Sequence, residues 1–442
     1  MDEAAKPLTH ARVLKIAIPI MLANVTVPIL GAVDTGVVGQ LGQAAPIGAV
    51  GVGAVILSAV YWIFGFLRMG TTGLTAQAVG QGNRPEVAAL LTRAIAIGLA
   101  GGLALILCQS LVIRGGFAVA PASAEVEALA ATYMRIRVWS APAAIAIYGI
   151  TGWLIAQERT RAVLGLQLWM NGLNVVLDLW FVLGLGWGVG GVATATFIAE
   201  WSGLALGLWL CRAAFRVPDW CDWARVFDSV KLKRMAVVNT DILIRSLLLQ
   251  TILVSFLLLG ARFGDVTLAA NQVLLQFMNI TSYAMDGFAF AAEALVGHAV
   301  GRRSAQLVRR SSIMAAFWGV GTAVLMAAGF VVLGPAIIDT MTTAAPVRAA
   351  ARDYLPWMAA VPLLGVLPFM LDGIFIGATR SADMRNMMAV SAAIYALAVV
   401  LLIGPLGNHG LWLALLISFA ARGLTLALRY PALERAVVAG AT

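Results

Sequence analysis

The sequence is poor in charge and in the residue types from which most catalytic and metal-binding sites are built. Only 12% of its 442 residues are charged, and it contains three histidines and three cysteines. Its lysines stand outside any Gly-x-x-x-x-Gly-Lys-Ser/Thr sequence, which excludes ATP hydrolysis by a P-loop. His-Glu-x-x-His and Gly-x-Ser-x-Gly are absent, and an odd number of cysteines indicates no disulfide framework. We therefore expect neither an enzyme nor a resident cofactor.

Apolar residues, by contrast, make up 61% of the chain and raise its mean hydropathy to +0.91. A soluble protein of this length needs far more polar surface. Apolar runs of about 20 residues can cross the hydrocarbon core of a bilayer as helices. Twelve such runs are centred near residues 24, 58, 101, 141, 173, 201, 247, 282, 320, 363, 395 and 420. The composition predicts an all-α integral membrane protein with twelve transmembrane helices.

The chain is a tandem duplication with an offset of 221 residues. The stretch 78–87 returns as 299–308, and the same offset carries Gly152 onto Gly373. Repeats of this size in a membrane protein are typical of transporters whose two halves move around a central site.

Each half contains six predicted spans. Because six is even, both halves enter the membrane from the same side, and their pseudo-two-fold axis runs along the membrane normal. We predict an N-terminal lobe at residues 1–211, an inter-lobe linker at 212–233 and a C-terminal lobe at 234–442.

Arginine and lysine residues indicate which side of the membrane the loops occupy. They gather before the first span and in every second loop, most densely at 212–234 and 302–310. Basic residues near span ends are retained in the cytoplasm, so both chain ends of this multi-pass cell-membrane protein are predicted to be cytoplasmic. The same distribution accounts for the net charge of +9 without a nucleic-acid partner.

Acidic residues inside predicted spans are the strongest candidates for function, because each costs at least about 2.5 kcal/mol on insertion scales. Asn171, Asn174 and Asp178 follow a three-then-four spacing that places two amides and a carboxylate on one helix face. Thr196 adds a hydroxyl from the next span, and Asp34 is the other lone acid of its region. If Asp34 and Asp178 converge, their mutual repulsion favours a bound proton or a sodium ion. An interhelical polar lock is the alternative interpretation.

Three motifs resemble those of the multidrug and toxic compound extrusion (MATE) family, in the form found in its DinF-type branch. They are VDTGVVGQLG at 33–42, LTAQAVGQGN at 74–83, and Asn174-x-x-x-Asp178 followed by GGVATAT at 190–196. Each motif consists mainly of small residues, but their order and spacing together are specific. The resemblance covers nearly the whole chain and both halves.

The resemblance implies a secondary multidrug exporter of two six-helix lobes that form a V around a central cavity. It implies export of cationic or amphiphilic small molecules in exchange for protons or sodium. The coupling positions of that branch match Asp34, Asn174, Asp178 and Thr196, and no metal site beyond sodium binding there is expected. The first span is expected to bend at Pro19, where proline removes a backbone hydrogen bond.

Aromatic and methionine side chains in the spans are candidates for the surface of an amphipathic cavity. They are Tyr61, Trp62, Phe64, Met69, Trp139, Tyr148, Trp153, Trp169, Met170, Phe256, Met278, Tyr283 and Met285. The expected partners are amphiphilic small molecules and the lipid bilayer, with the protein as a monomer.

Two other functions stay open at this point. A flippase for lipids or lipid-linked oligosaccharides has a related architecture, but pyrophosphate-linked cargo favours a more basic cavity than these mainly acidic spans predict. A channel or scaffold without alternating access is the third interpretation.

The second half carries acids of its own at Asp241, Asp286, Glu293 and Asp372, and their spacing defines no single site. Asp286 and Glu293 lie seven residues apart and share a helix face. The 221-residue offset places Arg68 opposite the interval between them. We expect Arg68 to pair with one of these acids near the cleft and to help set lobe closure.

Charge reversal at Arg68 should then impair transport in proteoliposomes, and unimpaired transport at normal expression would contradict the pairing.

Overall fold

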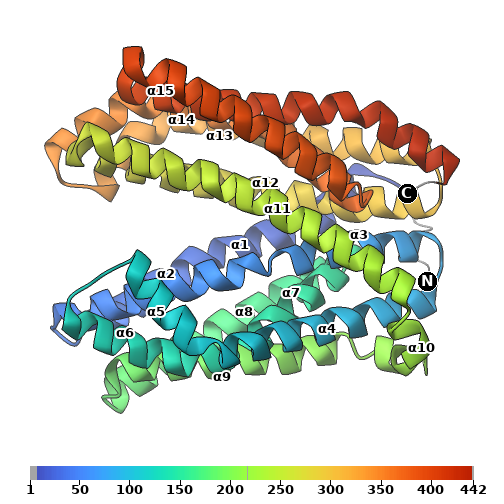
Figure 1. The fold of residues 1–442 in the computed structure, drawn as a ribbon, viewed down its shortest axis with the longest axis horizontal. Helices are drawn as coiled ribbons and strands as arrows, with labels where there is room; N and C mark the ends of the chain where they lie inside the picture. Colours follow the sequence, from blue (N-terminus) through green and yellow to red (C-terminus); the bar gives the residue numbers. More distant parts are fainter. Residues whose placement is uncertain (1–6, 217, 441–442) are drawn as a thin grey trace. The chain divides into compact units, whose positions relative to one another are not determined.

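The structure, a computed structural model, describes residues 7–216 and 218–440, and these residues contain helices and no strand (Figure 1). The long helices are α1 (His10–Gly39), α2 (Ala44–Ile63), α3 (Phe66–Gly80), α4 (Arg84–Leu107), α6 (Ala124–Arg137), α7 (Ala141–Ala156), α8 (Thr160–Asp178), α9 (Gly188–Leu210), α11 (Ser229–Gly260), α12 (Asp265–Gly301), α13 (Ala305–Met341), α14 (Ala345–Gly377) and α15 (Ser381–Ala439). The short ones are α5 (Gln109–Val119), α10 (Trp223–Val226), the 3₁₀ turns η2 (Val138–Ser140), η4 (Ala214–Arg216), η5 (Pro218–Cys221) and η6 (Ala261–Phe263), and the π-helical η3 (Leu179–Gly184).

The helices coincide with the twelve predicted spans. Ten helical stretches of the described residues are long and apolar enough to cross a membrane. The last of these, α15, covers two predicted spans, because Gly407 (φ 56°, ψ −132°) breaks its helical backbone. The remaining span is α12, whose hydropathy is lowered by polar side chains such as Asn271 and Asn279.

The described chain forms two compact units. The N-terminal unit comprises residues 22–75 and 83–232, and the C-terminal unit comprises 7–21, 76–82 and 233–440. Helix α1 therefore belongs to both units, because its first turns pack with the C-terminal one. The predicted lobe and linker boundaries stay predictions.

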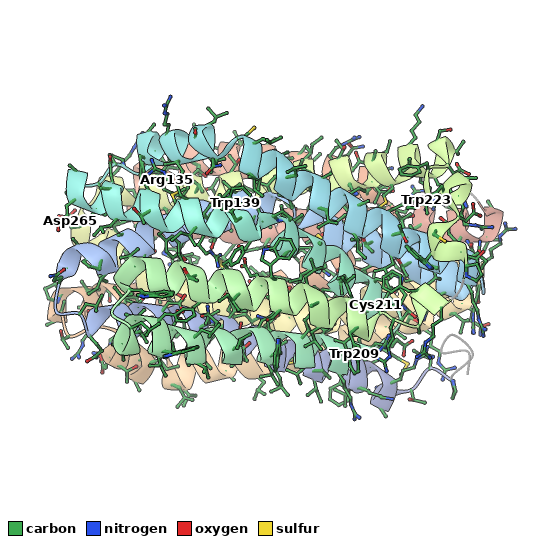
Figure 2. The ribbon with its side chains drawn as sticks, turned by 90° about the horizontal axis from the view of Figure 1, so that it is seen from below. Arg135, Trp139, Trp209, Cys211, Trp223 and Asp265 are labelled. Atoms are coloured by element: carbon green, nitrogen blue, oxygen red, sulfur yellow. The ribbon has the colours of Figure 1, made fainter. Side chains whose placement is uncertain are left out.

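In the N-terminal unit, α4 packs against α7, α2 against α6 and α8 against α9. The segment after α9 is bound to α4 through the buried Arg93, which donates to the carbonyl of Val226 (2.8 Å) and pairs with Glu86 (2.6 Å). Lys231 contacts the other oxygen of Glu86 at 2.5 Å. In Figure 2 this segment, marked by Trp223, lies at the opposite end of the unit from Arg135 on α6.

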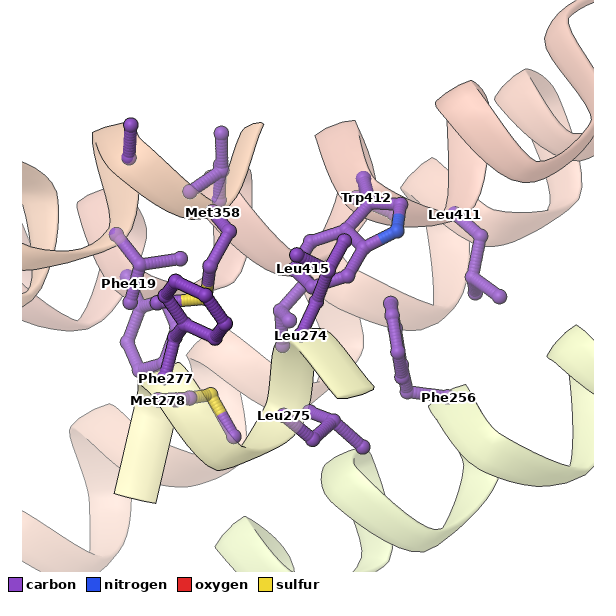
Figure 3. Close-up of a cluster of buried hydrophobic side chains, with 14 of the residues drawn as sticks. Phe256, Leu274, Leu275, Phe277, Met278, Met358, Leu411, Trp412, Leu415 and Phe419 are labelled. Atoms are coloured by element: carbon purple, nitrogen blue, oxygen red, sulfur yellow. The ribbon is translucent and has the colours of Figure 1, made fainter. Parts of the chain in front are cut away.

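The C-terminal unit has its core where α11, α12, α13, α14 and both parts of α15 meet, and Figure 3 shows a portion of it. Trp412 is fully buried there and packs edge-on against Phe256, with ring centroids 4.8 Å apart. Its indole N–H donates to Asn271 (2.9 Å), which also exchanges amide hydrogen bonds with Asn408. These pairings satisfy polar groups that would otherwise be costly to bury.

The two chain ends lie close to one turn of the C-terminal unit. Pro7 and Arg12 border the same pocket as Arg302, which follows α12. A Cβ built on Gly440 would lie 3.4 Å from the guanidinium carbon of Arg303. Both ends thus lie on one side of this unit, as an even number of spans requires.

The duplication is visible in the backbone. Gly82 and Arg303 both have left-handed φ angles (70° and 55°), and Glu158 and Thr379 repeat this at 58° and 52°. Each pair is separated by 221 residues. The two halves therefore end equivalent helices with the same turn geometry.

Close helix contacts at glycine repeat with the same offset. A Cβ on Gly152 would lie 2.3 Å from the carbonyl oxygen of Arg68, and one on Gly373 would lie 2.4 Å from that of Ala289. Small residues let membrane helices approach until their backbones touch. One helix contact in each unit thus depends on the absence of a side chain.

The substitution Gly373→Ala should lower the stability of the protein. Alanine favours a helix by up to about 1 kcal/mol, but the contact with Ala289 leaves no room for its methyl group, and overpacking costs about 1–3 kcal/mol. We expect a lower Tm in detergent. The matched control is Gly365→Ala on the same helix, where the nearest atom lies at 3.7 Å, and equal Tm values for both variants would contradict the interpretation.

Candidate functional site

The four residues predicted to bind a coupling ion meet in the N-terminal unit. Asp34 comes from the second part of α1, Asn174 and Asp178 from the end of α8, and Thr196 from α9. Asn174 and Asp178 are 1% and 0% exposed, so the site is sealed from solvent on the α8 side. The predicted spacing along α8 thus does place amide and carboxylate on one inward face.

Asn174 lies between the two acids and α9. With the amide oriented so that both of its ends are satisfied, its nitrogen donates to Asp34 Oδ1 (3.2 Å) and Asp178 Oδ2 (3.0 Å). Its oxygen then accepts from the backbone N–H (3.1 Å) and the hydroxyl (2.9 Å) of Thr196. One amide therefore connects three helices.

The side chains of Asp34 and Asp178 are also within hydrogen-bonding contact of each other. Two carboxylates in contact repel each other when both are ionised, so binding of a proton or a cation between them is favoured. The Oδ1 atom of Asp178 has no partner among the described residues, although it is buried. This oxygen can therefore accept one more interaction, from a proton or from a hard cation such as sodium.

The backbone changes its winding where the second acid sits. Asp178 is the last residue of α8, and the chain continues into the π-helical η3 before a turn at Gly186 (φ 70°). Phe181 in η3 stacks on Trp187 at 4.9 Å, and with Leu177 and Ala195 it forms a small core beside the site. Single π-helical turns interrupt the regular bonding ladder and recur at functional sites.

Further polar residues of α8 extend the site toward α1. Asn171 donates to the hydroxyl of Thr26 (2.7 Å) and accepts from Gln167 (3.0 Å). The face of α8 that ends in Asp178 is thus polar over about three turns, from Gln167 to Asp178, and is matched by a hydroxyl on α1.

A charged pair next to the acids was not expected from the sequence. Arg137, at the end of α6, contacts Glu200 of α9 at 3.2 Å, and the side chain of each is at least 87% buried. The hydroxyl of Tyr61 donates to the carbonyl of Arg137 at 3.0 Å. The guanidinium charge also acts on Asp34 and Asp178. The sequence did carry a signal for this pair. Arg137 lies inside an apolar run, and Glu200 is an acid inside an apolar run two spans later.

The equivalent positions of the C-terminal half carry different chemistry. At the 221-residue offset, Asp34 and Asn174 correspond to Ser255 and Tyr395, whose hydroxyls are 3.2 Å apart. Asp178 and Thr196 correspond to Val399 and Ile417. The repeat therefore preserves the helix contact, while acids at these particular positions occur in the first half only.

The acids predicted for the C-terminal half are held by arginines and a serine. Asp372 pairs with both Arg245 and Arg422, and all three are buried. Asp241 accepts from Ser381 (2.9 Å) and Arg385 (2.5 Å). Arg245 thus pairs with Asp372 on α14, although Asp241 lies only four residues before it on its own helix.

Asp286 is half-buried and Glu293 is 1% exposed, both on α12. Their predicted pairing with Arg68 stays a prediction, because the three residues are divided between the two units. Within the described residues, no three His, Cys, Asp or Glu side chains are grouped as metal ligands.

Several of the aromatic and methionine candidates serve packing. Phe256 and Met278 belong to the core of the C-terminal unit, and Trp153 is buried against α4, where it donates to the carbonyl of Val87 (2.8 Å). Trp139 and Trp169 are about half exposed. No set of cavity-lining residues follows from this distribution.

A duplicated bundle of helices that are long enough to span a membrane, with two interacting acids inside one half, is typical of membrane transporters. The chain belongs to the MatE family, whose family model matches it twice, at residues 19–180 and 242–403. Members of this family are membrane transporters rather than enzymes. The two matches fall on the two halves of the duplication.

Relatives in sequence span nearly the whole chain. The DNA damage-inducible protein F of Escherichia coli is 39% identical over 421 residues, which covers 93% of this chain and 90% of that protein. A probable multidrug resistance protein NorM of Bradyrhizobium diazoefficiens is 27% identical, with coverage of 96% and 94%. The predicted family and its DinF-type branch are confirmed.

Solved structures confirm the predicted fold class. The Vibrio cholerae MATE transporter VcmN in its bent form matches with a TM-score of 0.85 and 20% identity, and covers 97% of both chains. A transporter of the MOP superfamily from Pyrococcus furiosus matches with a TM-score of 0.85 and 16% identity, over 97% of this chain and 96% of that one.

Removal of the charge on Arg137 should destabilise the N-terminal unit. Arg137→Gln leaves Glu200 buried without a counter-ion, which we expect to cost about 3 kcal/mol and to lower the Tm in detergent. A second substitution, Glu200→Gln, should restore most of the loss because no unpaired charge then remains. If the double variant is as unstable as the single one, the ion pair is not the cause.

Proposed function

We propose that the protein is a secondary active exporter that exchanges cationic or amphiphilic small molecules for protons or sodium ions by alternating access of two lobes. The observation that supports this best is the contact of Asp34 with Asp178 below the amide of Asn174. The Bradyrhizobium relative is named as a probable multidrug resistance protein, which supports small molecules as the cargo. We further propose a cell-membrane monomer with both ends in the cytoplasm.

The cycle follows from the cost of burying charge. A cation that enters from outside neutralises one carboxylate of the pair, which makes closure of the outer side less costly and favours release of a cationic substrate. Loss of the ion to the cytoplasm restores the negative charge and the affinity for substrate. Ion and substrate thus bind alternately because both are stabilised by the same two acids.

The orientation of Asn174 favours a proton as the coupling ion. With its nitrogen toward the acids, the amide donates to both carboxylates and suits a pair that shares a proton. With the amide turned, its oxygen would become a third hard ligand for sodium, and its nitrogen would donate to Thr196 (2.9 Å). The first orientation satisfies every atom of the amide, so we infer proton coupling.

Asp34→Asn and Asp178→Asn should each abolish transport of a fluorescent lipophilic cation in proteoliposomes. Either change removes a carboxylate whose charge must alternate, so the rate should fall to that of empty liposomes. With the wild-type protein, a pH gradient alone should drive transport and a sodium gradient alone should not.

The matched control is Asp353→Asn, which removes an exposed acid of α14 and should transport at the wild-type rate. All variants are compared at equal amounts of folded protein, judged by gel filtration. Wild-type transport by either site variant refutes the mechanism, and transport driven by sodium alone refutes proton coupling.

Pro19 stays our proposed bending point of the first span. Helix α1 continues through it, but the helix changes from one compact unit to the other between Met21 and Leu22. The part of α1 before this change belongs to the C-terminal unit. It is held there against α12, since a Cβ on Gly287 would lie 2.5 Å from Met21 Cγ. Pro19→Ala in the same transport assay should slow the cycle of a folded protein, and an unchanged rate argues against bending there.

A flippase for an anionic lipid is the second candidate, and one observation favours it. Asp372 is paired with two buried arginines, so this cluster carries more positive than negative charge. Movement of a labelled anionic lipid across the liposome membrane, absent in Arg422→Gln but retained in Asp34→Asn, would support this candidate over the exporter.

A further inference from the structure

One end of the C-terminal unit has a basic pocket that the proposed transport cycle does not use. Its volume is about 290 Å³, and it lies between the start of α1, the end of α12 and the start of α13. Arg12, Arg302 and Arg310 line it together with His298 and Ser311. Among the described residues that line it, none is acidic.

Two arginines of this pocket, Arg302 and Arg310, are available for a ligand. Arg302 and Arg310 are exposed, and their side chains make no hydrogen bond or ion pair within the described part of the chain. The neighbouring Arg309, by contrast, is bound to Glu434 at 2.5 Å. Arginine guanidinium groups match the geometry of phosphate oxygens, which they bind with two parallel hydrogen bonds.

A separate apolar groove lies further along α13, beginning two residues after Ser311 of the pocket. It is lined by Ile313, Phe317, Val320 and Gly321 and has no polar surface. The spacing from Arg310 through Ile313 and Phe317 to Gly321 keeps these residues on one helix face, over about 16 Å of helix length. Trp318 borders the same groove and donates to His10 of α1 at 3.1 Å.

We propose that the pocket and the groove together bind one anionic phospholipid, with its phosphate between Arg302 and Arg310 and an acyl chain along α13. Basic pockets between helices at the membrane surface are suited to such headgroups. A purely apolar groove next to the phosphate site suits the attached hydrocarbon chain, which a free phosphate lacks. The bound lipid would hold the first turns of α1 against α12 and α13, on the same helix that carries Asp34.

The headgroup is tested by native mass spectrometry of the full-length protein with dioleoyl phosphatidylglycerol and dioleoyl phosphatidylcholine. We expect tighter binding of phosphatidylglycerol, and roughly a thirtyfold loss of that affinity in the double variant Arg302→Gln/Arg310→Gln. The control Arg303→Gln/Arg435→Gln removes the same charge from the same end outside the pocket and should keep wild-type affinity. Equal losses in both double variants would show a diffuse surface charge and overturn the site.

Inorganic phosphate is the competitor that separates the two sources of the anion. Millimolar phosphate should leave lipid binding unchanged, because it cannot occupy the groove. Displacement of the lipid by phosphate would assign the pocket to the free anion and overturn the lipid.

The acyl chain is tested by filling the groove. A Cβ on Gly321 meets no atom within 4 Å, so Gly321→Leu can enter the groove without disturbing the helix packing. We expect at least about a fivefold loss of affinity for the dioleoyl lipid and no change for a dihexanoyl analogue. Gly329→Leu, also in open space on α13, is the control, and an equal effect of both leucines would overturn the groove. These measurements read lipid binding alone and do not depend on transport.

Discussion

The contact between a buried and a partly buried carboxylate is the constraint on which the rest of the N-terminal unit depends. Asp34 and Asp178 lie in a span region where one charge is already costly, and their proximity favours binding of a proton or cation between them. Asn174 holds both acids and is itself held by Thr196. Three helices are therefore linked through one site, and the cycle we propose changes the charge of that site.

The two units treat their buried acids differently. In the C-terminal unit, Asp372 has permanent counter-ions in Arg245 and Arg422, so its charge needs nothing from solution. In the N-terminal unit, Arg137 is engaged by Glu200, and the two remaining acids rely on each other. A fixed ion pair stabilises one arrangement, whereas a shared proton or cation can leave. This difference is why we place ion coupling in the N-terminal half.

The duplication supplies a common framework on which these differences are built. Gly152 and Gly373 make the same backbone contact in each half, and equivalent helices end in turns of the same geometry. At the level of the site, Ser255 and Tyr395 stand where the first half has Asp34 and Asn174. Backbone packing is thus conserved between the halves because it fixes helix positions, while the side chains at the helix contact have diverged.

The sequence alone determined the fold class, the twelve spans, the repeat and the polar face of α8, because hydrophobic length and helical spacing are local properties of the chain. The resemblance to known motifs grouped Asp34, Asn174, Asp178 and Thr196 as one coupling site. Only the tertiary structure decided that Asp34 reaches Asp178, that Arg137 pairs with Glu200, and that Asp372 has two arginines. Asp34 and Asp178 are 144 positions apart in the sequence, and Arg137 and Glu200 are 63 apart. Such contacts depend on how helices rotate and cross, and the spacing of residues along one helix does not encode this.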